Sequence, residues 1–140
     1  MSRVYFTDRD LGKQFPRILT DAGLSVKRHA DLFHQEGSDE EWLEYCGKND
    51  CIAITHNSRI RYVPNEIAAV VRFKVRLLVV VGHATNAELA GNFVRTLHKI
   101  ESLMAGRSGP LIVKVYRPTP TELLKSTYAP GRAEVWFPRP

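Results

Sequence analysis

The chain has 140 residues, of which 44% are hydrophobic and 25% charged, so it suits one soluble globular domain and is too short for two. The net charge of +5 favours a polyanionic partner, although many basic domains bind no nucleic acid. The two cysteines, Cys46 and Cys51, cannot complete a zinc site and lack redox spacing, so we expect reduced thiols. We find neither a signal-peptide pattern nor an apolar run long enough to span a bilayer, and we expect a cytoplasmic protein without a membrane partner.

The N-terminal segment predicts a buried strand that ends at two aspartates and leads directly into a helix. Apolar residues fill positions 4–6, Asp8 and Asp10 follow, and Leu11 starts a helical pattern that ends at Gly23. Glycine is common just after the end of a helix. We expect Asp10, which is nearer the first helical turn, to cap this helix, because aspartate is a favoured N-cap.

The next part of the chain predicts a strand, a polar loop, a second helix and a third strand. Residues 24–28 form the strand and residues 29–37 the loop. Ser38 and Glu41 have the spacing of a capping box, in which the serine caps the helix and the glutamate bonds back to it. Residues 51–55 are apolar and predict the third, buried strand.

The second half of the chain continues the alternation of helix and strand. A helix begins at Pro64, since proline suits a first turn, and residues 75–81 form a strand that is apolar throughout. Thr85 or Asn86 caps a long helix, and residues 111–116 form a fifth strand. Strands that alternate with helices predict an α/β fold, a three-layer sandwich with a parallel central sheet.

The composition changes after the fifth strand and divides the chain into a domain of residues 1–117 and a tail of residues 118–140. The tail contains five of the eight prolines, together with several aromatic and aliphatic residues. It is too apolar for a disordered linker. We therefore expect it to pack on the domain or on a partner.

Acidic side chains follow separate strands and are expected to gather at one edge of the sheet. The carboxyl ends of parallel strands share an edge, where open α/β sheets bind their ligands. Asp8 and Asp10 lie there, and helical spacing turns Asp39 toward the same edge, with Glu40 at its flank and Glu41 facing away. Converging carboxylates are tolerated when protonated or when they hold a hard cation such as Mg²⁺ or Mn²⁺. Helix capping explains the same residues about equally well, so both interpretations stay open.

Basic side chains near this edge are candidates for contacts with phosphate groups. Arg9 lies beside the first helix, and Arg59 and Arg61 follow the third strand. His56, at the end of that strand, is a candidate for substrate contact rather than for metal binding, because it stands alone among oxygen ligands. A solvated surface explains any single arginine as well, and the pair after the third strand is the stronger candidate.

Three short motifs in the first two-thirds of the chain stand in a fixed order. They are TDRDL at residues 7–11, SDEE at residues 38–41 and ITHNSR at residues 54–59. In this order they resemble a PIN-like domain ribonuclease, and most closely the small bacterial toxins of toxin–antitoxin pairs. The resemblance implies a five-stranded parallel sheet in the order 3-2-1-4-5 and cleavage of RNA with Mg²⁺ or Mn²⁺. It also implies a cognate antitoxin protein as a partner and is compatible with a homodimer.

The same resemblance assigns roles to individual residues. Asp8 and Asp39 match family acids that hold the metal ion, with Glu40 and Asp10 as further candidates. A third family acid normally ends the third strand, and Asn57 stands at that position here. Asparagine keeps one carbonyl oxygen for a metal but removes a charge and cannot act as a base. The catalytic set of Asp8, Asp39 and Asn57 thus belongs either to a naturally weakened enzyme or to an inactivated variant.

Two other functions fit parts of the pattern. A non-catalytic RNA- or protein-binding module is consistent with Asn57 and with the apolar tail. A phospho-receiver domain also has an acidic pair after its first strand, a hydroxyl after its fourth strand, here Thr85, and a lysine near its fifth, here Lys114. Its phospho-acceptor would fall at Asn57, and receivers are usually acidic, so we favour the nuclease.

Overall fold

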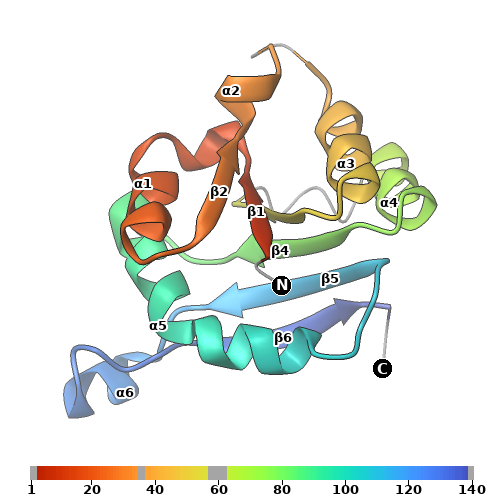
Figure 1. The fold of residues 1–140 in the computed structure, drawn as a ribbon. Coiled ribbons are helices and arrows are strands. Elements are labelled where there is room, and N and C mark those ends of the chain that lie inside the picture. Colours follow the sequence, from red (N-terminus) through yellow and green to blue (C-terminus); the bar gives the residue numbers. More distant parts are fainter. Residues whose placement is uncertain (1–2, 35–36, 57–62, 139–140) are drawn as a thin grey trace.

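A six-stranded sheet forms the centre of the computed structural model, which describes residues 3–34, 37–56 and 63–138. The strands are β1 (Val4–Thr7), β2 (Ser25–Arg28), β3 (Ile52–Thr55), β4 (Arg76–Val80), β5 (Leu111–Tyr116) and β6 (Arg132–Phe137). The helices are the short 3₁₀ helix η1 (Arg9–Leu11), α1 (Gln14–Asp21), α2 (His29–Leu32), α3 (Asp39–Lys48), α4 (Pro64–Arg72), α5 (Asn86–Met104) and α6 (Pro120–Lys125). Figure 1 shows these elements in their spatial arrangement.

The strands lie in the order β2-β1-β3-β4-β5-β6, and the first five run parallel to one another. The predicted α/β fold with a parallel core is confirmed, whereas the predicted order 3-2-1-4-5 is wrong. The burial of the strands explains the difference. Alternate residues of β2 are exposed, so it fits the edge of the sheet, while every residue of β3 is buried and β3 needs a neighbour on both sides.

The sixth strand, β6, pairs antiparallel with β5 and closes the sheet on the side opposite β2. The prediction of five strands is therefore corrected. The prolines of this segment lie outside residues 132–137, so they leave the backbone donors of the strand intact. An antiparallel edge strand on an otherwise parallel sheet is common.

Buried polar groups of α5 hold the end of β5 and the residue that precedes β6. Asn92 Nδ2 donates to the carbonyl of Tyr116 over 3.1 Å, and the Thr96 hydroxyl accepts from the Gly131 N–H over 2.9 Å. A Cβ atom on Gly131 would lie 1.8 Å from the Tyr116 carbonyl oxygen, so only glycine fits there without a shift. By contrast, α6 projects from the body of the molecule and buries none of its residues (Figure 1).

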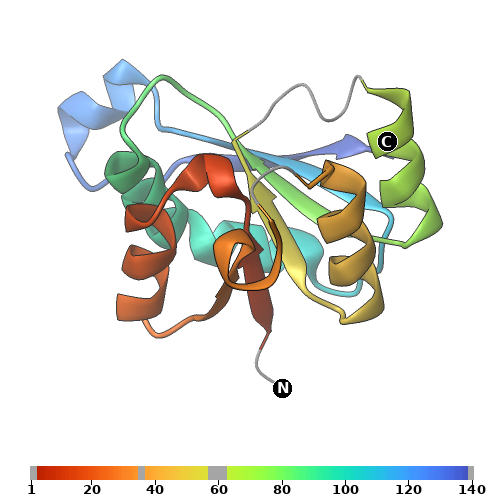
Figure 2. The same ribbon diagram turned by 90° about the horizontal axis from the view of Figure 1, so that it is seen from above.

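Helices cover both faces of the sheet, with α1 and α5 on one face and α3 and α4 on the other (Figure 2). Tyr5 of β1 packs with Phe93 of α5 on the first face, and Phe6 stacks on Trp42 of α3 on the second. Because neighbouring residues of a strand face opposite sides, β1 contributes to both cores. Cys46 and Cys51 are free and buried, as expected of reduced thiols.

The segments that follow β1 and β2 differ from the prediction. The first helix is broken at Gly12, whose φ of +64° separates η1 from α1, so no continuous helix runs from Asp10. The region of residues 29–37, predicted as a loop, contains the one-turn helix α2. None of the described helices is both long and apolar enough to cross a membrane.

Candidate functional site

Asp8, directly after β1, is a buried carboxylate held by two hydrogen bonds. Its Oδ1 accepts from the Arg9 N–H over 2.7 Å, and its Oδ2 accepts from the Thr55 hydroxyl over 2.8 Å. The residue is only 4% exposed. Burial, followed by the charge of Asp10, raises the pKa of Asp8 to about 7, even though the bond from Thr55 favours the charged form. This carboxyl group therefore titrates near neutral pH.

Asp10 lies in η1 and faces the end of β3. Its Oδ2 accepts from the His56 N–H over 3.2 Å and lies 3.3 Å from the Thr55 hydroxyl. Desolvation raises the pKa of Asp10, against the opposite effect of these bonds. The prediction that Asp10 caps the first helix is wrong. The helix begins at Arg9, two residues earlier than expected, so Asp8 is the N-cap, and the Asp10 carboxylate bonds across to β3.

Helix α3 brings Asp39 to the same edge of the sheet. The indole Nε1 of Trp42 donates to Asp39 Oδ1 over 2.9 Å. Trp42 is itself fully buried and stacks on Phe6, with 5.5 Å between ring centroids. The charge of Asp39 contributes to the raised pKa of both Asp8 and Asp10, so the three carboxylates lie within electrostatic range. The packing of a core tryptophan thus fixes the orientation of Asp39.

The start of α3 differs from the predicted capping box. Ser38 is the N-cap, but its side chain makes no capping hydrogen bond. The Glu41 side chain does not bond back to Ser38, because its carboxylate lies toward Gly37 instead. A Cβ atom built on Gly37 would be only 2.9 Å from Glu41 Oε2. Glu40 is exposed. The acidic first turn is still favourable at the positive end of the helix dipole.

Glu66, in the first turn of α4, is an acidic residue that was not among the predicted site residues. Burial, followed by a hydrogen bond and charge repulsion from Asp39, raises its pKa to about 7. Its Oε2 atom is buried and accepts no hydrogen bond from any of the described residues. The available signal was an acid two residues after Pro64, at the start of a helix that follows a strand. Such a helix starts at the carboxyl edge of a parallel sheet.

The acidic group, which we define as Asp8, Asp39 and Glu66, lacks a basic counterpart among the described residues. None of the ion pairs there involves one of these three carboxylates. Within the same ranges, no three His, Cys, Asp or Glu side chains converge closely enough to hold a metal ion as they stand. The site therefore concentrates negative charge and relieves part of it through raised pKa values.

The other predicted site residues divide into two sets. Asn57, Arg59 and Arg61 lie outside the described residues. His56 is half-buried, and its Nε2 lies 3.1 Å from the carbonyl oxygen of Gly82 after β4, which anchors the ring. Arg9 is exposed beside Asp8.

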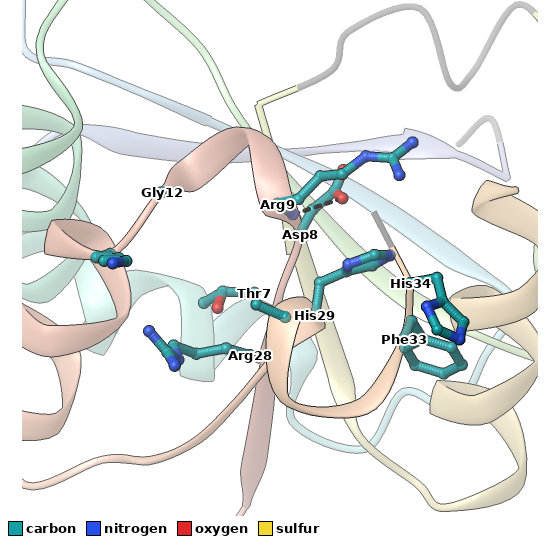
Figure 3. A pocket seen from close by; sticks show the side chains of 10 residues that line it. Thr7, Asp8, Arg9, Gly12, Arg28, His29, Phe33 and His34 are labelled. Atoms are coloured by element: carbon teal, nitrogen blue, oxygen red, sulfur yellow. Dashed lines mark hydrogen bonds between the residues drawn. The ribbon is translucent and has the colours of Figure 1, made fainter. Parts of the chain in front are cut away.

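A pocket of about 460 Å³ opens next to Asp8, between η1 and α2 (Figure 3). Basic, aromatic and polar side chains line it, among them Arg9, Lys13, His29 and Phe33. Burial and the charge of Arg9 lower the pKa of His29, so its imidazole is neutral at pH 7. The carboxyl edge of the sheet thus carries the acidic group and, beside it, a pocket with basic walls.

Comparison with known proteins identifies the family. The model of the PIN-like domain family matches residues 3–82, which include the acidic group and strands β1 to β4. No curated protein and no solved structure matches the chain. Because the match spans more than half of the 140 residues, the chain belongs to the PIN-like domain family.

Proposed function

We propose that this protein is a metal-dependent endoribonuclease that hydrolyses phosphodiester bonds of RNA. PIN-like domains form a superfamily of nucleases. The observation that carries the proposal is the acidic group, whose members come from three separate elements of the fold. Burial, with a further contribution from the charge of Asp39, raises the pKa of both Asp8 and Glu66 to about 7. Carboxylates with pKa values near 7 in one cluster are costly for stability and typical of functional sites.

The donor chemistry of the acidic group fits Mg²⁺ or Mn²⁺. Carboxylate oxygens are the ligands that hard divalent cations prefer. Glu66 Oε2 is buried and has no partner in the part of the chain that the structure describes, and a cation would satisfy it. Asn57 carries one charge fewer than the family pattern, and Glu66 restores a third carboxylate from α4. We therefore assign the acidic group as the main metal-binding set. Further oxygen donors are Asp10, Glu40 and Asn57.

The chain's own residues orient the reacting groups. The carboxylates of the acidic group would hold a divalent ion, and such an ion would activate a water molecule and stabilise charge on the phosphate oxygens. The Trp42 indole holds Asp39 Oδ1, and the Thr55 hydroxyl holds Asp8 Oδ2. Both carboxylates are thus oriented before substrate arrives, which lowers the cost of reorganisation during the reaction.

Basic side chains next to the acidic group are proposed to hold the RNA backbone. Arg9 is exposed beside Asp8 and forms no ion pair within the described part of the chain. Most protein hydrogen bonds to nucleic acids go to phosphate and sugar. Arg59, Arg61 and His56 are proposed to contact the same strand of RNA, and the net charge of +5 supports a polyanionic substrate.

A cleavage assay tests the proposal. Purified protein with Mn²⁺ should cut labelled single-stranded RNA internally, and EDTA, Asp39→Asn or Glu66→Gln should abolish the cuts. Glu41→Gln, an exposed acid of the same helix as Asp39, should cut as wild type does. Asn57→Asp should cut faster because it adds a carboxylate.

The contrary outcome of the assay points to the second function. In that outcome, wild type and Asn57→Asp both leave the RNA intact while still binding it in a salt-sensitive way without metal. That result would establish a non-catalytic binding module.

We further propose that the enzyme is the toxin of a type II toxin–antitoxin pair, neutralised by a cognate antitoxin protein. The small basic domain and the order of its motifs support this role. Induced expression in bacteria should arrest growth, and Asp8→Asn should relieve the arrest. Normal growth despite expression of protein that cleaves RNA in vitro would remove the toxin role and leave the nuclease in place.

The contacts of two residues give no support to the phospho-receiver alternative. The order of the first five strands occurs in that class of fold, so topology does not separate the two. The Thr85 hydroxyl, however, accepts from the Glu88 N–H over 3.1 Å and serves as a helix cap. Lys114 Nζ lies 5.8 Å from the ring centroid of Tyr116. Both side chains thus have structural roles.

A further inference from the structure

The pocket beside Asp8 contains residues that the proposed cleavage chemistry does not use. Its volume of about 460 Å³ falls within the usual range for small-molecule sites, roughly 300–1,000 Å³. In Figure 3, Arg9, His29 and His34 lie on one side of Asp8, and Gly12 and Arg28 lie on the other. Asp8 is the only member of the acidic group that lines it.

The charge of the pocket favours an anion. Arg9 and Lys13 line it, and neither forms an ion pair with a described residue. Arg28 is already engaged by Asp31 through two hydrogen bonds of 3.1 and 2.8 Å. Asp8 is the one acidic side chain among the described lining residues. A phosphate group can therefore meet two cations that have no other partner in the described chain.

A buried hydroxyl in the wall of the pocket lacks a hydrogen-bond partner. Thr7 lines the pocket and is 1% exposed, and its Oγ1 bonds to no described group. Leaving a buried polar atom unpaired is costly, and such atoms in folded proteins call for an explanation. A ligand that carries a hydroxyl or amide group in addition to its charge would satisfy this atom.

The wall at the end of α2 is aromatic and packs against the core of the domain. Phe33 packs edge-on against Phe6 and Tyr45, with centroid distances of 6.1 and 5.7 Å. The neutral ring of His29 lies 5.5 Å from that of Phe33. Aromatic side chains held in place in this way offer a surface against which a nucleobase packs.

We propose that this pocket binds one nucleotide of the RNA strand, with the phosphate at Arg9 and Lys13 and the sugar and base against Thr7 and Phe33. A nucleotide combines the three features that the walls match: a phosphate, hydroxyl groups and an aromatic base. Since the pocket adjoins Asp8, an occupant there places the neighbouring phosphodiester at the acidic group. The assignment rests on the proposed ribonuclease function and names the subsite that positions its substrate.

Titration of the full chain in EDTA with nucleoside 5′-monophosphates tests the inference without requiring cleavage. Inorganic phosphate and adenosine are titrated in parallel, with calorimetry for affinity and backbone amide NMR shifts for location. We expect a monophosphate to bind at least about tenfold more tightly than either fragment. The amide shifts should be concentrated in residues 7–13 and 28–34.

Two variants and a control make the test specific. Lys13→Gln and the nearly isosteric Thr7→Val should each weaken binding by about fivefold or more. Arg95→Gln, an exposed arginine of α5 outside the pocket, should not alter it. Thr7→Val should leave the Tm unchanged or higher, because it removes an unpaired buried hydroxyl, and this outcome shows that weaker binding is not a folding defect.

The results separate this inference from the proposed function. Equal affinity for phosphate and monophosphate, shifts outside the pocket, or unchanged binding by Lys13→Gln would each overturn the nucleotide site. RNA cleavage by a protein with no monophosphate binding would overturn the site and leave the nuclease. Binding in the pocket without any RNA cleavage would overturn the nuclease and leave a nucleotide-binding pocket.

Discussion

The Thr55 hydroxyl donates a hydrogen bond of 2.8 Å to Asp8 Oδ2 and thereby joins the ends of two neighbouring parallel strands, β3 and β1. Thr55 is fully buried and Asp8 nearly so. The bond stabilises the ionised form of Asp8 and opposes the effect of burial on its pKa. A residue of one strand thus orients an acid on another and lowers its pKa, against the larger effect of burial.

Thr55→Val tests this control. Valine keeps the shape of threonine but cannot donate, so the pKa of Asp8 should rise further above 7. Titration of the Asp8 carboxyl carbon by NMR measures the shift directly. Thr20→Val, which changes an exposed threonine of α1, is the matched control. An unchanged or lowered pKa of Asp8 in Thr55→Val would contradict this role of the hydroxyl.

The ion-free protein should become less stable as pH rises because of Asp8. Its folded-state pKa of about 7 lies above the ordinary aspartate value of 3.8, so the folded state binds more protons between these values. The free energy of unfolding therefore decreases from about pH 4 to pH 7 and levels off above that range. Asp8→Asn removes this dependence, so wild type should lose roughly 2 kcal/mol relative to the variant between pH 5 and 8. Denaturant unfolding in EDTA measures the difference, and parallel pH profiles for the two proteins would refute it.

Trp42→Phe should impair metal binding because it removes the donor that holds Asp39 Oδ1. Phenylalanine retains most of the stacking on Phe6, so the fold should persist with reduced stability. The Mn²⁺ concentration for half-maximal stabilisation of the fold should rise several-fold relative to wild type. Trp136→Phe, which also loses an indole but lies on β6, should keep the wild-type requirement. The same increase in both variants would remove the positioning role of Trp42.

Gly131→Ala should destabilise the protein by roughly 2 kcal/mol or more, since its Cβ would lie 1.8 Å from the Tyr116 carbonyl oxygen. Gly91→Ala is the matched control. It meets only the flexible end of Arg95 at 3.2 Å and lies inside α5, where alanine is favoured over glycine. Thermal unfolding should show a lower Tm for the first variant and an equal or higher Tm for the second. Equal effects of the two substitutions would show that β6 is not held at Gly131.

The sequence predicted the elements better than their arrangement. Apolar runs and helical periodicity located the first five strands and the long helices, because these patterns depend on local burial. The strand order depends on which strands reach the edge. The polar alternation of β2 and the apolar run of β3 carry that information in the sequence, whereas the predicted order came from the family resemblance.

The site shows the same limit. Asp8 and Asp39 were selected because they follow a strand and open a helix, and the structure brings their charges within range of each other. Glu66 was missed because its one signal in the sequence, an acid in the first turn of a helix that follows a strand, is equally typical of an acid that only favours the helix dipole. Its importance arises from the packing of α3 beside α4, a tertiary relationship that spacing along the chain does not encode.

The most direct test of the central claim is Mn²⁺-dependent thermal stabilisation, measured together with RNA cleavage, for wild type, Asp8→Asn, Glu66→Gln and the control Glu41→Gln. We predict that Mn²⁺ raises the Tm of wild type and Glu41→Gln and supports cleavage by both, while Asp8→Asn and Glu66→Gln show neither effect. A wild-type Tm that does not respond to Mn²⁺, together with intact RNA, would contradict the assignment of these carboxylates to a catalytic metal site.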